Sequence, residues 1–229
     1  MPDAFGKVLS DQRDVLLFRR VDLDLDRYQR QHLAWGLLTT WLAGVGRYWD
    51  HPSASLVQYM GLGSIVYVFL LSLLIWGVAA PLKPARWSYT HVLVFVMLTS
   101  LPALLYAMPV EKFMSLPAAQ LTNMLFLAVV AAWRVALLLR FLLTAAGLSW
   151  PATLVAGLLP LALIVTALTM LNLEKAVFDI MGGLREQTQY DSAYGVLVMI
   201  TALAWLASPV LLLAYAVLAS RAQRGKPAA

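Results

Sequence analysis

The feature of this sequence that most limits its fold is a set of long stretches without Asp, Glu, Lys or Arg. A helix of about 20 apolar residues can cross the hydrocarbon core of a bilayer, and each stretch reaches that length. Strands of a membrane β-barrel alternate apolar and polar residues, whereas residues 68–74 are apolar apart from Ser72. The pattern predicts an all-α fold, a polytopic transmembrane helix bundle. The five stretches are residues 52–82, 87–110, 113–133, 141–173 and 192–220.

Composition restricts the class of protein further. The chain is 61% hydrophobic and 13% charged, compared with roughly 45–50% and about 25% in soluble domains. It has no cysteine, which excludes disulfides and thiolate metal sites. Basic residues on the cytoplasmic side of the membrane, beside anionic lipids, explain the net charge of +5. We therefore expect the lipid bilayer as the main partner, a membrane-protein partner or a second copy of the chain as further candidates, and no nucleic acid.

The order of polar and apolar segments predicts three parts. Residues 1–31 are a polar tail, expected to form one or two surface helices and to be partly disordered. Residues 32–219 are the transmembrane domain, and residues 220–229 are a basic tail. Residues 173–191 carry apolar side chains at helical spacing and are expected to form an amphipathic helix on the outer surface. The predicted spans are residues 32–49, 56–80, 90–108, 116–143, 149–172 and 192–219.

The first of these spans is shorter than the others and has two interpretations. His32–Gly46 is uncharged for only 15 residues. That is about 22 Å of helix against a hydrocarbon core of about 30 Å, which favours a re-entrant or interfacial helix. Charge favours a crossing, because six spans place 13 basic residues on the cytoplasmic side and 4 on the other. We therefore predict six crossings, with both termini in the cytoplasm of a bacterial inner membrane.

Arg134 is the main candidate for a functional side chain, because it interrupts an otherwise apolar helix. An ionisable residue at membrane depth is costly and is usually paired or functional. A hairpin after residue 143 places Arg134 level with Pro160. The proline ring frees a carbonyl near Ala156, which an inward-pointing arginine can satisfy. The alternative is that Arg134 extends to the cytoplasmic face and reinforces Arg140 there.

Asp50 and His51 belong to the densest group of chemically versatile side chains, the segment Arg47–Pro52. They can bind a ligand or titrate, but an aromatic anchor at the membrane surface followed by a turn explains the segment equally. The histidines are scattered, without the spacing of metal ligands. The sequence also lacks the usual motifs for nucleotide binding, metalloproteases and serine hydrolases. We therefore expect no catalytic residue, metal ligand or cofactor.

Small residues on two of the predicted spans favour close packing of helices, because they let backbones approach one another. They are Gly36, Gly44, Gly61, Gly63 and Ser64.

Three functional hypotheses follow from these features. The favoured one is a non-enzymatic accessory, scaffold or membrane-organising protein, because the spans carry few polar residues and the loops are short. The second is a translocator of a lipid or small solute, with Arg134 and the prolines inside the spans shaping its path. The third is an intramembrane enzyme that uses Asp50, His51 and Asp179 at the outer face.

Overall fold

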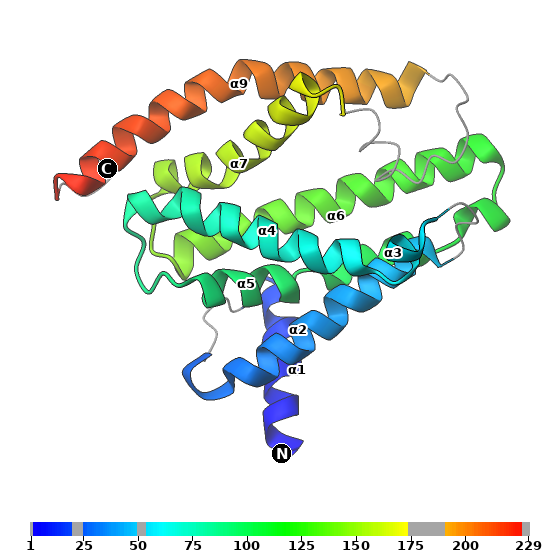
Figure 1. Cartoon of the computed structure of the whole chain (residues 1–229), viewed down its shortest axis with the longest axis horizontal. Helices are drawn as coiled ribbons and strands as arrows, with labels where there is room; N and C mark the ends of the chain where they lie inside the picture. Colours follow the sequence, from blue (N-terminus) through cyan, green and yellow to red (C-terminus); the bar gives the residue numbers. More distant parts are fainter. Residues whose placement is uncertain (1, 20–24, 50–53, 174–190, 226–229) are drawn as a thin grey trace.

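The computed structural model describes residues 2–19, 25–49, 54–173 and 191–225, which form helices and the turns between them (Figure 1). The expected external helix at 173–191 falls almost entirely outside these residues. The elements are α1 (Pro2–Leu16), α2 (Leu25–Tyr48), α3 (Leu56–Tyr59), α4 (Leu62–Ala79), η1 (Ala80–Leu82), α5 (Tyr89–Leu98), η2 (Leu101–Ala107), η3 (Val110–Lys112), α6 (Leu116–Thr144), α7 (Trp150–Met170) and α9 (Asp191–Gln223).

Five helical segments of the described chain are long and apolar enough to cross a membrane. They confirm the predicted polytopic helix bundle, and α4, α6, α7 and α9 supply four of them. Many of their large apolar side chains are exposed, as expected of surfaces that face lipid. The segments are Leu62–Leu82, Tyr89–Lys112, Pro117–Thr144, Trp150–Met170 and Val198–Gln223.

The loops gather at two opposite ends of the bundle. At the end that we call the Ala85 end, the Ala85 N–H donates to the Ala146 carbonyl (2.8 Å) and Lys83 Nζ donates to the Gln223 carbonyl (3.5 Å). At the other end, the Ala107 end, Trp49 Nε1 donates to the Ala107 carbonyl (2.9 Å). Successive spans therefore run alternately between these ends, as the short connections require.

Helix α2 runs in the same direction as α5 and η2 and lies beside them. A Cβ added at Gly36 would lie 2.7 Å from Met97 Cβ, and Thr40 Oγ1 donates to Ser100 Oγ (3.2 Å). Farther along, Trp49 meets Ala107. With 24 residues, α2 begins before the uncharged stretch and bends at Tyr28 (φ −123°, ψ 22°). Residues 29–48, beyond the bend, form about 30 Å of helix, which is longer than the uncharged stretch of 15 residues alone indicated.

The span that follows the Ala85 loop, made of α5 and η2, is broken in the middle. Helix α5 ends at Leu98 after ten residues, and the chain continues as the 3-10 helix η2 with Pro102 in its first turn. Polar side chains satisfy the carbonyls at the break: Thr99 Oγ1 donates to Val96 O (2.9 Å), and Ser100 Oγ donates to Met97 O (2.6 Å). Every residue from Val92 to Leu98 is buried, so the break lies at the centre of the bundle.

Helix α1 is one of the helices expected in residues 1–31, and it packs against the bundle through buried side chains. Val8 and Val15 are fully buried, and Asp11 and Gln12 are 4% and 3% exposed. In Figure 1, α1 lies across the direction of the spans, with the N-terminus projecting away from them. The docking was not predicted, because two of the buried side chains of α1, Asp11 and Gln12, are polar and such residues are usually exposed.

Candidate functional site

A group of polar side chains holds α1 against α2 at a buried position. Asp11 Oδ2 lies 3.0 Å from His32 Nε2, and Lys7 Nζ pairs with the other carboxylate oxygen. His32 is fully buried, and its Nδ1 lies 2.9 Å from the Tyr28 carbonyl. A carbonyl only accepts, so Nδ1 carries a proton. The hydrogen bond between His32 and Asp11 therefore contains one further proton, on either the ring or the carboxyl.

Gln12 connects α1 to the broken span. Its Nε2 donates to the Leu98 carbonyl (3.0 Å), and its Oε1 accepts from Trp35 Nε1 (2.7 Å). The last carbonyls of a helix have no partner within the helix, so Gln12 caps α5 at the position where α5 stops. The α1 helix is capped in turn, because Trp133 Nε1 donates to the Leu16 carbonyl (3.0 Å). We call Lys7, Asp11, Gln12, His32 and Trp35 the α1 clip.

A second polar contact lies toward the Ala107 end, between Arg47 on α2 and Tyr106 on η2. Arg47 Cζ lies 4.7 Å from the centroid of the Tyr106 ring. Arg134 on α6 lies within electrostatic range of the same phenol. Neither arginine takes part in an ion pair within the described residues.

The structure places Arg134 half-buried on α6, close to the level of Pro160. Gly157 packs against Leu139, since a Cβ added at Gly157 would lie 2.6 Å from Leu139 Cδ2. Arg134 lies farther from the same turn and is therefore level with residues just beyond Pro160, which is buried inside α7. Within the described residues no hydrogen bond joins Arg134 to the Ala156 carbonyl, and its charge lies within electrostatic range of Tyr106 on η2.

The other candidates from the sequence are spread over the chain. Arg140 is half-buried, and its Nε has no hydrogen-bond partner in the described part of the chain. Asp50 and His51 lie outside the described residues. Sequence reasoning missed Asp11 and Gln12, because a carboxylate and an amide in a polar tail give no sign that they will be buried.

The described residues contain no group of three or more His, Asp or Glu side chains that could hold a metal ion. The described residues offer hydrogen bonds and charge: a buried acid–histidine pair, and an arginine stacked on a tyrosine ring. Comparisons with models of protein families, with curated proteins and with solved structures found no match.

Proposed function

We propose that this chain is a non-enzymatic membrane-organising protein of a bacterial inner membrane, in which α1 is a helix inserted into one leaflet. The observation that supports this function is the α1 clip. An amphipathic surface helix is ordinarily held by lipid alone. Here buried hydrogen bonds of Asp11 and Gln12 fix α1 to the bundle. The helix is therefore inserted into the leaflet at a fixed position relative to the spans.

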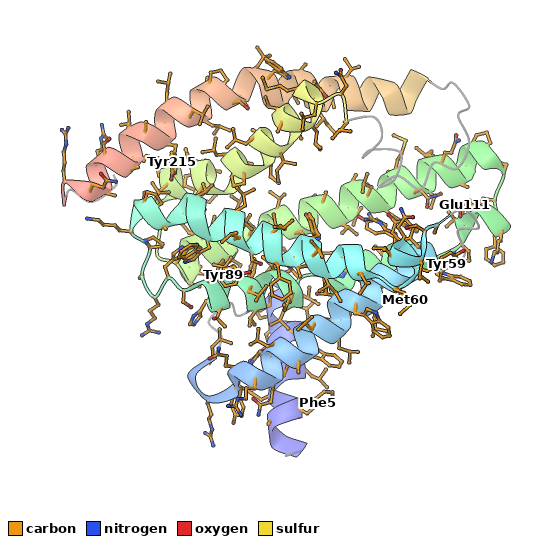
Figure 2. The ribbon with its side chains drawn as sticks, in the orientation of Figure 1. Phe5, Tyr59, Met60, Tyr89, Glu111 and Tyr215 are labelled. Atoms are coloured by element: carbon orange, nitrogen blue, oxygen red, sulfur yellow. The ribbon has the colours of Figure 1, made fainter. Side chains whose placement is uncertain are left out.

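The depth of α1 supports insertion into the leaflet. Its C-terminal end meets Trp133, which precedes Arg134 and lies 7 residues from Arg140 in the direction of the Ala85 end. That separation is about 10 Å of helix, and interfacial helices lie about 5–10 Å into the boundary between head groups and acyl chains. Phe5, Leu9 and Leu17 are 52%, 39% and 49% exposed. Figure 2 shows Phe5 on the part of α1 that extends from the bundle.

The preference of the protein for curved membranes tests this function. Reconstituted wild-type protein is expected to reach a higher density on small vesicles than on large ones, because packing defects of curved bilayers accept inserted apolar side chains. The double substitution Phe5→Ser and Leu9→Ser should abolish the difference. Leu206→Ser on α9, at a 73% exposed position away from α1, is the matched control and should retain it. Equal wild-type densities on both vesicle sizes would refute the proposal.

We also propose that α2 crosses the membrane, which gives six crossings and places both termini in the cytoplasm. Two facts support this topology. The Ala85 end carries the more basic segments, as cytoplasmic ends do. Helix α2 also runs beside α5 and η2 and reaches Ala107.

The absence of native cysteine makes the topology simple to test, because a single introduced thiol is the sole target. Pro2→Cys is expected to react with a membrane-impermeant maleimide only after the cells are opened. Phe113→Cys, at an 81% exposed side chain near the Ala107 end, should react in intact spheroplasts and serves as the control. Labelling of Pro2→Cys in intact spheroplasts would contradict six crossings.

A translocator of a lipid or small solute is the second candidate, favoured by the break between α5 and η2. Discontinuous helices line substrate sites in many transporters, and charged side chains at depth mark their pathways. The same reconstituted vesicles separate the two functions. Movement of a labelled lipid between leaflets, lost in Arg134→Gln, would support translocation; curvature preference without lipid movement supports the membrane-organising function.

A further inference from the structure

We propose that Asp11 and His32 together form a buried proton-binding site that couples the docking of α1 to pH. The pair joins α1 to α2, with Asp11 Oδ2 and His32 Nε2 3.0 Å apart. His32 is 0% exposed and Asp11 is 4% exposed, so both depend on protein groups for their hydrogen bonds. The docking of α1 is a feature of the fold, whereas the consequence for membrane insertion rests on the proposed function.

The two ring nitrogens of His32 fix the number of protons in the docked state. Nδ1 lies 2.9 Å from the Tyr28 carbonyl oxygen, which only accepts, so Nδ1 carries a proton. A second proton lies between Nε2 and the Asp11 carboxyl, because an unprotonated nitrogen and a carboxylate are both acceptors. The docked pair therefore holds one proton more than a neutral histidine and an ionised aspartate hold together.

Loss of this extra proton removes a hydrogen bond in either tautomer of the ring. With Nδ1 protonated, the lone pair of Nε2 faces the Asp11 carboxylate; with Nε2 protonated, the lone pair of Nδ1 faces the Tyr28 carbonyl. A buried polar group without a partner destabilises the docked state. Water solvates both groups once α1 is released, so the docked state binds the proton more tightly than the released state.

Lys7 is the charged side chain that contacts the pair, through the other carboxylate oxygen of Asp11. Its positive charge opposes the extra proton, but its side chain is 36% exposed, so water screens this effect. Elements α3, α4 and η2, which also pack against α2, carry no Asp, Glu, Lys, Arg or His. Other charged or histidine side chains described on neighbouring elements are exposed or interact elsewhere: Arg13 with Asp14, Arg27 with the Tyr28 ring, Arg30 exposed, Arg47 with Tyr106, His91 with Ser88, and Arg134 within electrostatic range of Tyr106.

The docking of α1 is expected to weaken as pH rises, because the docked state holds the extra proton. A solvated histidine is protonated below about pH 6.5, so at about pH 5–6 the two states hold equal numbers of protons and docking does not depend on pH. Above about pH 7 the released state has lost the proton and the docked state retains it. The ratio of released to docked α1 then rises by up to tenfold per pH unit, the limit for one proton.

Hydrogen exchange of the full chain in lipid nanodiscs tests this inference. A released helix of 15 residues is marginally stable by itself, so the protection of α1 amides, corrected for the intrinsic exchange rate at each pH, reports the ratio of released to docked α1. Protection in α1 should be constant at about pH 5–6 and fall by up to tenfold per unit above about pH 7. Protection in α7 serves as the internal reference. Constant corrected protection of α1 up to about pH 8.5 would show the proposal to be wrong.

Substitutions assign the proton to this pair. Asp11→Asn supplies an amide that donates to His32 Nε2 without a titrating proton, so α1 should stay docked and its protection should no longer depend on pH. His32→Gln, whose amide donates to the ionised Asp11, should behave alike and serves if Asp11→Asn fails to fold. His91→Gln removes the histidine beside Ser88 on α5 and is the matched control. Dependence on pH that persists in Asp11→Asn and His32→Gln, or that disappears in His91→Gln, would overturn the assignment.

The preference for small vesicles separates this inference from the proposed function. Protection of α1 that falls with pH in a protein without that preference would keep the proton site and remove the membrane-organising function. A preference for small vesicles in a protein whose α1 protection is independent of pH would keep the function and remove the proton site.

Discussion

Replacing Asp11 with alanine is expected to lower the free energy of unfolding by about 3 kcal/mol, because removing one partner of a buried pair leaves the other group uncompensated. Asp11 is 4% exposed and contacts both His32 and Lys7. Its loss leaves the fully buried His32 Nε2 facing apolar surroundings. The measurement is denaturant unfolding in detergent micelles. Release of α1 should also let its backbone unfold around Arg13, whose side chain is already exposed, so a faster cleavage by trypsin there is a second readout.

The matched control for Asp11 is the neighbouring acid Asp14. Asp14 pairs with Arg13 at 3.1 Å, but the arginine side chain is 60% exposed. Exposed ion pairs contribute about 0–1 kcal/mol, so Asp14→Ala should change neither the unfolding free energy nor the trypsin cleavage rate by much. If Asp11→Ala is as mild as Asp14→Ala, then the α1 clip does not hold α1 to the bundle.

Replacing Gly44 with valine is expected to have a comparable effect, a loss of about 3 kcal/mol at the upper end for overpacked cores. A Cβ at Gly44 would lie 2.7 Å from Ser64 Oγ and 2.8 Å from the Gly61 carbonyl oxygen. The carbonyl belongs to the backbone and cannot rotate away, so α2 must separate from α4. The unfolding free energy in detergent measures the loss, and size-exclusion chromatography reports any failure to assemble.

Gly63 provides the control for Gly44, because it is also a glycine inside a helix of the bundle. A Cβ added at Gly63 meets nothing within 4 Å, so Gly63→Val should leave the unfolding free energy nearly unchanged. A similar loss at both positions would point to a general effect of valine in these helices, and not to the close approach of α2 and α4.

The apolar spans followed directly from the sequence. The predicted spans 116–143 and 149–172 correspond closely to α6 (Leu116–Thr144) and α7 (Trp150–Met170). The reason is that the free energy of transferring a helix into lipid is the sum of contributions from about 20 consecutive residues. No knowledge of neighbouring helices is needed for that sum, and this is why composition sufficed.

The broken span was only partly visible. The sequence predicted one helix over 90–108, and Pro102 is the residue that disfavours continuing it. The place where α5 stops, however, depends on donors for its last carbonyls. One of them is Gln12, which lies 86 residues away from Leu98 in the chain. Such a contact is set by the packing of α1 and leaves no periodic signal in either segment.

Arg134 is a single residue for which the sequence showed one property and the tertiary structure another. Its position in an apolar helix marked it as unusual from the sequence alone, because the cost of burying a charge is a local property. Tyr106, the phenol within electrostatic range of Arg134, belongs to η2, and only the packing of η2 with α6 places it there. The packing of the helices determines which groups lie near a buried charge.

The sequence by itself determined that this protein is a bundle of membrane-spanning helices, with five segments located by their apolar length. Only the tertiary structure decided that α1 is docked, that Gln12 caps the broken span, and that Arg47 stacks on Tyr106. The physical reason is the distance along the chain over which each kind of interaction acts. Partition into lipid depends on each segment alone, whereas hydrogen bonds and charge pairs between helices depend on which segments, far apart in the chain, become neighbours.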